Sequence, residues 1–189
     1  MGVRNYLIEG VSGAGKTAVA TELCRRGHHA IHGDRDLAYL GDPETGLPLV
    51  LETDPPTAKW MSEHHIWDVE KVKAHIANRD EALTFFCGGS RNSAKFVDLL
   101  DGVFVLEVDF DTMRRRIDER VALDPTDFGG TPEERDLIAR LYATKRDVPQ
   151  NATSIDAVRP IARVVDDILS KCGASDEGAD RQIPHQRNR

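Results

Sequence analysis

Short apolar runs alternate along the chain with longer segments in which apolar residues recur at every third or fourth position. A short run bounded by turn residues is typical of a buried strand, and the longer period is typical of an amphipathic helix. Alternating strands and helices predict an α/β fold with a parallel sheet. The expected strands are residues 3–9, 29–34, 82–89, 102–109 and 152–156, and the expected helices are residues 15–26, 59–78, 92–100, 111–121, 132–146 and 158–171.

Turn-forming residues mark the segments between these elements. Asn92 or Ser93 could cap the helix that follows it, because both side chains accept hydrogen bonds from a first helical turn. Residues 41–58 are rich in proline and glycine, and a loop of this length in a compact domain is usually functional. Residues 122–131 predict a second loop.

Composition and charge narrow the class of protein. The chain has 189 residues, 40% hydrophobic and 30% charged, which suits one soluble domain. We expect this domain to cover residues 1–171, and we expect residues 172–189 to be disordered because Ile183 is their one large apolar residue. The apolar runs are too short for a membrane span, and the N-terminus leads directly into a strand, so we expect no membrane segment and no signal peptide. The net charge of −7 argues against nucleic acid as a partner, and three scattered cysteines suggest reduced thiols in a cytoplasmic protein.

The segment YLIEGVSGAGKTAVATEL joins the first predicted strand to the first predicted helix. Its glycines allow backbone N–H groups to curl around an anion, and the start of the helix adds the positive end of its dipole. The pattern G-x-x-x-x-G-K-[ST] from Gly10 to Thr17 is that of a phosphate loop. Lys16 would contact the β- and γ-phosphates of ATP or GTP, and the Thr17 hydroxyl would bind Mg²⁺. The expected nucleotide-binding residues of this segment are Gly10, Ser12, Gly13, Ala14, Gly15, Lys16, Thr17 and Ala18.

Over residues 3–171 the chain resembles the small P-loop kinases of the adenylate, shikimate and gluconate kinase type. GVSGAGKTAVA is similar to the gluconate kinase phosphate loop. HGD at residues 32–34 stands where these kinases carry D-x-D or D-G-D, and CGGS at residues 87–90 stands at the glycine turn that contacts the acceptor in shikimate kinases. The resemblance implies a five-stranded parallel sheet in the order 2-3-1-4-5 with helices on both faces. It also implies a substrate lobe at residues 37–78, a short lid at residues 121–131, and phosphoryl transfer from ATP with Mg²⁺.

Asp34 follows the second predicted strand and would emerge beside the γ-phosphate. Its carboxylate could orient an acceptor hydroxyl and take its proton, or hold a water on Mg²⁺, while a helix N-cap is the structural alternative. Asp36 could share this work or act as a first-turn helix charge. Because His32 replaces the first carboxylate of the D-x-D pattern and the third strand ends without an aspartate, Thr17 and Asp34 are the expected magnesium ligands. The expected acceptor contacts are Asp34, Arg35, Asp36, Gly88, Gly89 and Arg91.

Three arginines near the predicted lid could contact the nucleotide. RRRIDERV at residues 114–121 is similar to the segment that opens the adenylate kinase lid, which implies that Arg116 stacks on adenine and Arg120 contacts phosphates. These two arginines lie one helical turn apart and share a face, and the guanidinium group suits both roles. Arg140, in RLY, would approach the transferred phosphoryl group when the lid closes. A solvated charged face remains an equal alternative for these arginines.

The predicted substrate lobe is acidic. Residues 37–70 contain seven carboxylates against Lys59 alone, which leaves six net negative charges. An anionic acceptor would meet like charges there unless Arg35 or Arg91 reached it. The charge balance therefore favours a neutral or cationic hydroxylated acceptor.

The stretch KWMSEHHIWD in this lobe could stack on a ring of the acceptor through its aromatic side chains. Trp60, His64, His65 and Trp67 are the candidates. Two tryptophans seven residues apart are more typical of the core face of a helix, and that interpretation is favoured.

These observations favour an ATP-dependent phosphotransferase that acts on a small hydroxylated metabolite, namely a nucleoside, a sugar or an amino-bearing compound. One alternative is a nucleoside monophosphate kinase. An alternative of another class is a nucleotide-binding regulatory protein. The expected catalytic residues are Lys16, Asp34, Arg120 and Arg140.

Overall fold

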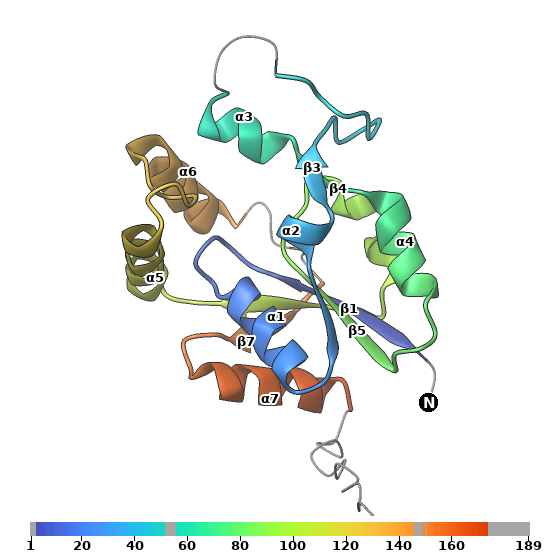
Figure 1. The fold of residues 1–189 in the computed structure, drawn as a ribbon. Helices are drawn as coiled ribbons and strands as arrows, with labels where there is room; N and C mark the ends of the chain where they lie inside the picture. The colour runs from blue at the N-terminus through green and yellow to red at the C-terminus, as the bar shows by residue number, and fades with distance from the viewer. Residues whose placement is uncertain (1–2, 52–55, 146–148, 150, 174–189) are drawn as a thin grey trace, which may run out of the picture.

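The computed structural model describes residues 3–51, 56–145, 149 and 151–173, and five parallel strands form its main sheet (Figure 1). These strands are β1 (Arg4–Glu9), β2 (His29–His32), β5 (Leu83–Cys87), β6 (Gly102–Glu107) and β7 (Thr153–Asp156). They lie in the order β2-β5-β1-β6-β7, and all four neighbouring pairs are parallel. Counted along the chain within this sheet, the order is 2-3-1-4-5, as the resemblance implied.

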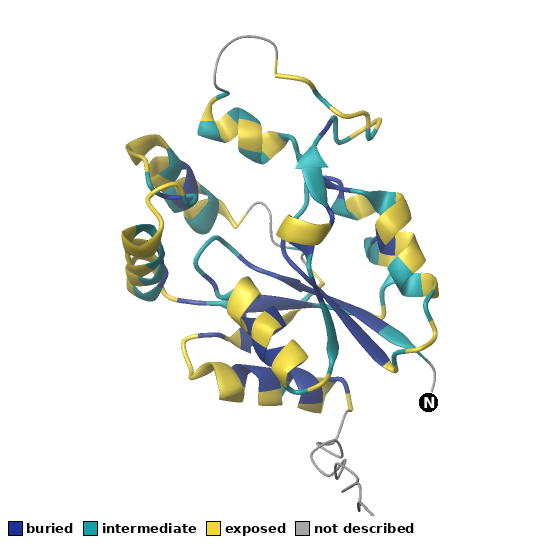
Figure 2. Cartoon of the chain, in the orientation of Figure 1, coloured by how far each residue is buried: buried dark blue, intermediate teal, exposed yellow. Residues whose placement is uncertain are grey.

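Alternate side chains of the strands pack into two hydrophobic clusters, one on each face of the sheet. Ile8 of β1 belongs to the larger cluster, which includes side chains of α1 (Lys16–Arg25) and α7 (Ile161–Lys171). Leu7 belongs to the smaller cluster, which includes a side chain of α4 (Val69–Ala77). Neighbouring residues of a strand point to opposite faces, so both faces are buried (Figure 2). The predicted α/β layering is confirmed.

The predicted helix at residues 59–78 is wrong, because a strand interrupts it. α3 (Ala58–Glu63) ends before β4 (His65–Trp67), and α4 begins after that strand. β4 pairs antiparallel with β3 (Ala38–Leu40), and these two strands form a small second sheet. The apolar pattern did not reveal β3, which is three residues long and only partly buried.

The interruption follows from the packing of Trp67. This side chain is fully buried, stacks on Phe96 with ring centroids 5.6 Å apart, and lies against Gly33, where a Cβ atom would be only 2.1 Å from the indole ring. Asp68 then caps α4 by accepting hydrogen bonds from its first turn, so the helix starts anew. Trp60 lies on α3, and the two tryptophans therefore do not share a helix face.

Residues 92–100 form two 3₁₀ turns, Ser93–Lys95 and Val97–Leu99, in place of the predicted helix. The Asn92 side chain makes no cap bond. Its Oδ1 accepts from the Trp67 backbone N–H at 3.1 Å, and its Nδ2 donates to the Trp67 carbonyl at 2.9 Å. A buried amide engaged in this way satisfies backbone groups of β4 and cannot also cap a helix.

Two helices flank the predicted lid. α5 (Phe110–Leu123) continues two residues beyond its predicted end, and α6 (Pro132–Thr144) begins with proline as expected. Thr131 and Glu134 form a capping box that fixes the start of α6. The predicted lid therefore comprises the end of α5 and the loop that leads to this cap.

The C-terminal end of the described chain differs from the prediction in two respects. α7 begins after Pro160, which stands at its N-cap, rather than at Val158. Cys172 is buried in the larger cluster, so the folded domain extends past residue 171. The predicted disorder of the tail falls on residues 174–189, which lie outside the described residues. The three cysteines are free thiols, and within the described ranges no helix has the length and apolar character that a membrane crossing needs.

Candidate active site

The phosphate-loop pattern forms a tight turn between β1 and α1. Gly10, Gly13 and Gly15 all have positive φ, with values of 152°, 81° and 107°. A Cβ atom at Gly13 would lie 2.9 Å from the Met113 carbonyl oxygen, so this position also requires glycine for lack of space. The turn therefore leads directly into α1, and phosphate binding by its N–H groups stays a prediction.

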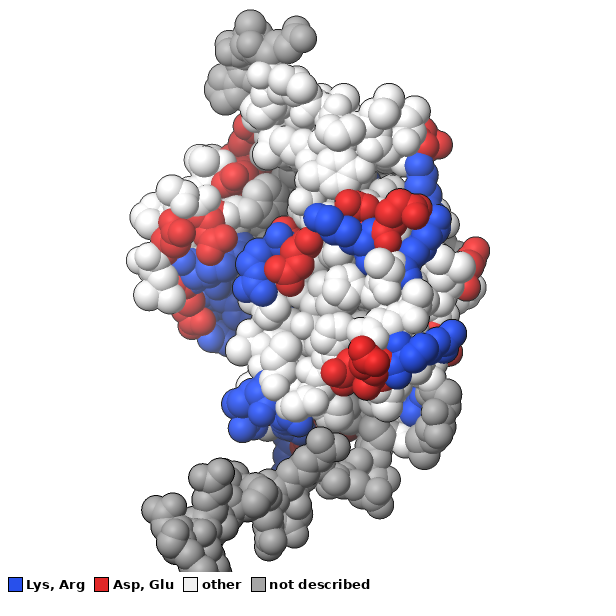
Figure 3. Space-filling view, turned by 45° about the vertical axis from the view of Figure 1, so that its right-hand side comes forward, with Lys and Arg blue, Asp and Glu red and all other residues white. Residues whose placement is uncertain are grey.

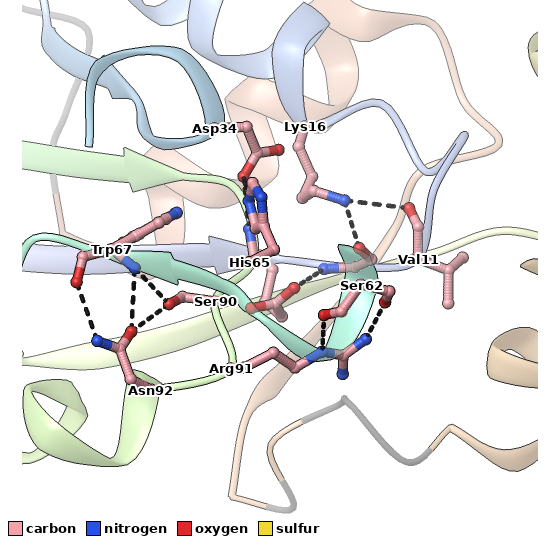
Figure 4. A network of polar contacts seen from close by, with 12 residues as sticks. Val11, Lys16, Asp34, Ser62, His65, Trp67, Ser90, Arg91 and Asn92 are labelled. Carbon is pink, nitrogen blue, oxygen red and sulfur yellow. Dashed lines mark hydrogen bonds and ion pairs between the residues drawn. The ribbon is translucent and has the colours of Figure 1, made fainter. Parts of the chain in front are cut away.

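Lys16 is the first residue of α1, and its ammonium group turns back over the loop. It donates hydrogen bonds to the carbonyl groups of Gly10 and Val11, the second at 3.2 Å (Figure 4). The positive end of the α1 dipole and this ammonium group face the same space. An anion held by the loop would meet both charges.

One cavity of about 900 Å³ is lined along its length by the whole phosphate loop and extends to the small β3–β4 sheet. Gly10 to Val19 line one end. His65, Gly89 and Arg91 line the other end, which we call the acceptor end. The volume is near the upper limit of ordinary ligand pockets and leaves room for two ligands placed end to end.

Asp34 lies in α2 (Gly33–Asp36), a single helical turn that follows β2. Its Oδ1 faces the His65 Nε2 at 3.3 Å and accepts from the Gly89 backbone N–H at 3.1 Å. Partial burial raises the pKa of Asp34, but the His65 hydrogen bond, the nearby Lys16 charge and the Gly89 N–H outweigh it and hold that pKa below its usual range. Because Asp34 is inside α2 and makes no N-cap bond, the helix-cap alternative is wrong.

Gly88 and Gly89 form the predicted glycine turn after β5. A Cβ atom at Gly88 would lie 2.6 Å from both the Asp34 Oδ1 and the Trp67 ring, and one at Gly89 would lie 2.7 Å from the Glu9 Oε1. The turn therefore lets two carboxylates approach the end of the sheet. Gly89 lines the cavity, and its contact with an acceptor stays a prediction.

Glu9 is a cavity-lining carboxylate that is not among the predicted site residues. It ends β1, is 7% exposed, and its Oε1 accepts from the Gly10 N–H at 3.2 Å. The third predicted strand, β5, lacks a terminal aspartate, and Glu9 brings a carboxylate to the same edge from the neighbouring strand. Its position directly before the glycine loop was the available signal.

The predicted acceptor contacts Arg35 and Asp36 are not brought into the cavity. Arg35 is 71% exposed and pairs with Asp36 at 3.0 Å, and Asp36 also accepts from the His32 backbone N–H. Arg91 does line the cavity, and its guanidinium group donates to the Ser62 carbonyl at 2.6 Å and to the Ser62 hydroxyl at 2.5 Å (Figure 4). Of the two arginines considered for an anionic acceptor, Arg91 has the suitable position.

Arg116 and Arg120 both extend from α5 into the cavity. Arg116 donates to the carbonyl groups of Ala14 at 3.0 Å and Ala157 at 2.7 Å, which places it at the outer wall of the phosphate loop. Arg120 lies 3.4 Å from the Ser12 hydroxyl and also donates to the Phe128 carbonyl. The two helical neighbours therefore reach the loop from the lid side, in agreement with the shared face inferred from their spacing.

Arg140 is not at the cavity. It is exposed on α6, and its guanidinium group contacts the Asp136 carbonyl of its own helix at 3.5 Å. Its neighbours Ile138 and Leu141 line the cavity instead. A catalytic role for Arg140 stays a prediction that requires the lid helix to move.

The acidic residues of the lobe that the structure describes do not form an acidic site. All five of them lie outside the cavity lining, and Glu44 is exposed, as are parts of Asp42, Glu63, Asp68 and Glu70. Asp42 closes a turn by accepting from Thr45, and Asp68 caps α4. Glu63 and Glu70 pair with lysines. On the face shown in Figure 3, acidic and basic side chains are intermingled. The net charge of the segment therefore gives no support for a neutral or cationic acceptor.

Comparisons with known proteins agree with this architecture. No family model matches the chain. A stretch of 74 residues is 43% identical to a gluconokinase from Gluconobacter oxydans (strain 621H), and it spans 38% of this chain and 40% of that protein. The match thus covers less than half of the relative.

Two crystal structures match over nearly the whole chain. One is a sugar kinase from Janibacter sp. HTCC2649, with a TM-score of 0.52, 18% identity, and coverage of 95% of this chain and 99% of that one. The other is a shikimate kinase from Bacteroides thetaiotaomicron, with a TM-score of 0.54, 17% identity, and coverage of 92% and 99%. These likenesses show a shared fold.

Proposed function

We propose that this chain, which has the fold of the small P-loop kinases, transfers the γ-phosphoryl group of ATP to a hydroxyl group of a small molecule. The observation that carries the proposal is one continuous cavity, which is lined by the phosphate loop and by the residues of the acceptor end. A protein that only sensed a nucleotide would need no polar second end next to the γ-phosphate position. The continuity of the cavity therefore favours a kinase over the regulatory alternative.

The residues of the phosphate end would bind and neutralise the triphosphate. The loop N–H groups and Lys16 would hold the β- and γ-phosphates, and Arg120 would add positive charge from the lid side. Arg116 would flank the adenine, because it lies at the outer wall of the loop and guanidinium groups stack on rings. Electrostatic stabilisation of this kind is the main contribution to phosphoryl transfer.

Asp34 would act at the acceptor end. The acceptor oxygen forms a bond to the γ-phosphorus while the bond from that phosphorus to the β–γ bridging oxygen breaks, and the hydroxyl proton passes to Asp34. The depressed pKa of Asp34 keeps it ionised and able to accept a hydrogen bond from the hydroxyl. Its main effect is to position the oxygen, since phosphoryl transfer needs little base strength.

A magnesium ion fits the oxygen donors around the loop. Thr17 and Glu9 line the cavity and offer a hydroxyl and a carboxylate, which are ligand types that Mg²⁺ prefers, and Asp34 next to the lining would be the alternative carboxylate ligand. When bound, Mg²⁺ would neutralise charge on the β- and γ-phosphates. Glu9 joins the predicted pair because it is buried beside the glycine loop.

The acceptor class we propose is a hydroxylated metabolite that includes nucleosides, sugars and amino-bearing compounds. Sugar acids are added to it for two reasons: Arg91 lines the acceptor end, and the described carboxylates of the lobe lie outside the cavity lining. Guanidinium groups bind carboxylates in a bidentate manner. The partial match to a gluconokinase supports the same addition.

The test is a screen for acceptor-dependent release of ADP. The purified chain is given MgATP and, one at a time, D-gluconate, shikimate, D-glucose, D-glucosamine, adenosine and AMP. We expect at least one hydroxylated compound to raise the rate well above the rate without acceptor. AMP as the best acceptor would favour the nucleoside monophosphate kinase alternative. Slow hydrolysis that no compound stimulates would contradict the kinase proposal.

A further inference from the structure

His65 lies between Asp34 and the cavity. Its backbone belongs to β4, its ring lines the acceptor end, and its Nε2 is 3.3 Å from the Asp34 Oδ1 (Figure 4). The described lining of the cavity includes His65 and Gly89 but not Asp34. The two groups that contact the Asp34 Oδ1 are therefore the groups that face the ligand space.

In the contact between His65 and Asp34, histidine is the hydrogen-bond donor and the carboxylate is the acceptor. The Asp34 Oδ1 already accepts from the Gly89 backbone N–H, and the oxygens of a carboxylate group only accept hydrogen bonds. The His65 Nε2 therefore carries the hydrogen and donates, whether the ring is neutral or protonated. With the Gly89 N–H at 3.1 Å, two donors hold the same oxygen. Two donors on Oδ1 fix the rotation of the carboxylate and leave Oδ2 to receive the acceptor hydroxyl.

The backbone that carries His65 is held in place by the segment after β5. The Arg91 N–H donates to the His65 carbonyl at 3.0 Å, and the Trp67 N–H donates to the Ser90 hydroxyl at 3.0 Å. Asn92 adds two further bonds to Trp67. The position of the imidazole is thus set by the same turn that supplies Gly89.

Gly88 lies close to both the Asp34 carboxylate and the Trp67 ring. A Cβ atom there would lie 2.6 Å from the Asp34 Oδ1 and 2.6 Å from the Trp67 ring. Trp67 is fully buried beside the same position, so glycine leaves the room there that the carboxylate and the indole ring both occupy. The Asp34 carboxylate therefore lies close to Gly88 and is hydrogen-bonded to His65 and Gly89.

We propose that His65 is a positioning residue of the acceptor site, which orients the Asp34 carboxylate through the Nε2–H···Oδ1 hydrogen bond. The inference rests on the proposed function, since it concerns the residue that receives the acceptor hydroxyl. It adds a side chain of the substrate lobe to the site and makes the correct docking of β4 a condition for phosphoryl transfer. A misdirected carboxylate would bind the acceptor in an unproductive orientation.

The test compares two substitutions of His65. Glutamine places its Nε2–H the same number of bonds from Cα as histidine does, so His65→Gln keeps the donor, whereas His65→Ala removes it. The matched control is His64→Ala, because His64 stacks on Trp60 with its Nδ1 2.9 Å from the Trp60 carbonyl and lies outside the described cavity lining. Steady-state kcat and KM for ATP are measured with the compound of the screen that the parent chain phosphorylates fastest.

We expect His65→Ala to lower kcat about 10- to 100-fold with KM for ATP within about threefold of the parent. His65→Gln should recover most of that loss, and His64→Ala should match the parent. Equal losses in His65→Ala and His65→Gln would overturn the proposal and assign His65 a proton-transfer role of its own. Parent-like kcat in His65→Ala would also overturn it while leaving the kinase proposal intact. A parent chain that no acceptor stimulates would overturn both.

Discussion

The two ends of the cavity are built in different ways. The phosphate end comes from one continuous segment, in which Gly10, Lys16 and Thr17 lie within eight residues of each other. The acceptor end is assembled from α2, β4 and the turn after β5, which are far apart in sequence. Local geometry fixes the first end, whereas the second depends on long-range packing around Trp67. Substitutions at the two ends should therefore have different effects on turnover, ATP binding and stability.

The largest effect should come from the phosphate end. Lys16→Ala removes the charge that faces the β- and γ-phosphates, and we expect kcat to fall about 10²- to 10³-fold or more, the range for a lost electrostatic contact at a transition state. The melting temperature should stay near that of the parent, because the lysine contacts only loop carbonyls. Lys73→Ala, on exposed α4, is the control. A well-folded Lys16→Ala protein with normal turnover would contradict the role of the loop.

At the acceptor end, Asp34→Asn should lower kcat about 10²-fold, the scale of one positioned base. KM for ATP should change little, because the triphosphate is held by the other end. The loss should be constant from pH 6 to 8, since the pKa of Asp34 lies below the usual value near 4 and the carboxylate stays ionised throughout. Asp80→Asn, at an exposed bend, serves as control. An equal loss in ATP binding would instead make Asp34 a magnesium ligand.

Arg120 lines the cavity and Arg140 does not, so substitutions of these two arginines can be compared. Arg120→Ala should lower kcat/KM for ATP about 10-fold or more, because Arg120 lies 3.4 Å from the Ser12 hydroxyl of the loop. Arg140→Ala should have a smaller effect, since Arg140 is exposed on α6. Steady-state kinetics of both variants measure the difference. A larger loss for Arg140→Ala would show that the lid helix turns inward during turnover.

Glu9 tests whether the end of β1 belongs to the metal site. Glu9→Gln keeps the shape and the hydrogen-bonding oxygen but removes the charge, so we expect about tenfold weaker Mg²⁺ binding. Titration calorimetry of Mn²⁺ with the chain and ADP gives the affinity without turnover. Glu70→Gln on α4 is the matched control. Unchanged affinity in Glu9→Gln would limit its role to holding the Gly10 N–H.

Asn92 tests the packing that holds the acceptor end together. Asn92→Ala leaves the Trp67 carbonyl without the bond that it receives from Nδ2 and weakens the support of the Trp67 N–H. We expect the free energy of unfolding in urea to fall by about 1–3 kcal/mol. The exposed Asn151→Ala should change it by less than about 0.5 kcal/mol. Equal stability of the two variants would mean that β4 does not depend on this amide.

The same contrast explains what the sequence could predict. The alternation of strands and helices follows from local pattern and the phosphate loop from its motif, while the strand order is what the family resemblance implies, and all three are present. His65 was weighed only as a stacking residue, because a helix-like apolar spacing in residues 59–78 concealed β4. The net charge of the lobe does not say where each carboxylate points: Asp68 and Glu70 lie at the first turn of α4, and the charge of the acceptor stays a prediction. Tertiary packing sets the directions of the side chains at the acceptor end. The spacing of residues along the sequence does not predict those directions.

Transfer of label from [γ-³²P]ATP to the acceptor tests the central claim most directly. The parent chain is incubated with MgATP and the fastest compound of the screen, and labelled product and ADP are counted in the same samples, with Lys16→Ala as the blank. We predict one labelled acceptor for each ADP formed and only background label with Lys16→Ala. ADP released together with free labelled phosphate, and no labelled acceptor, would contradict the account.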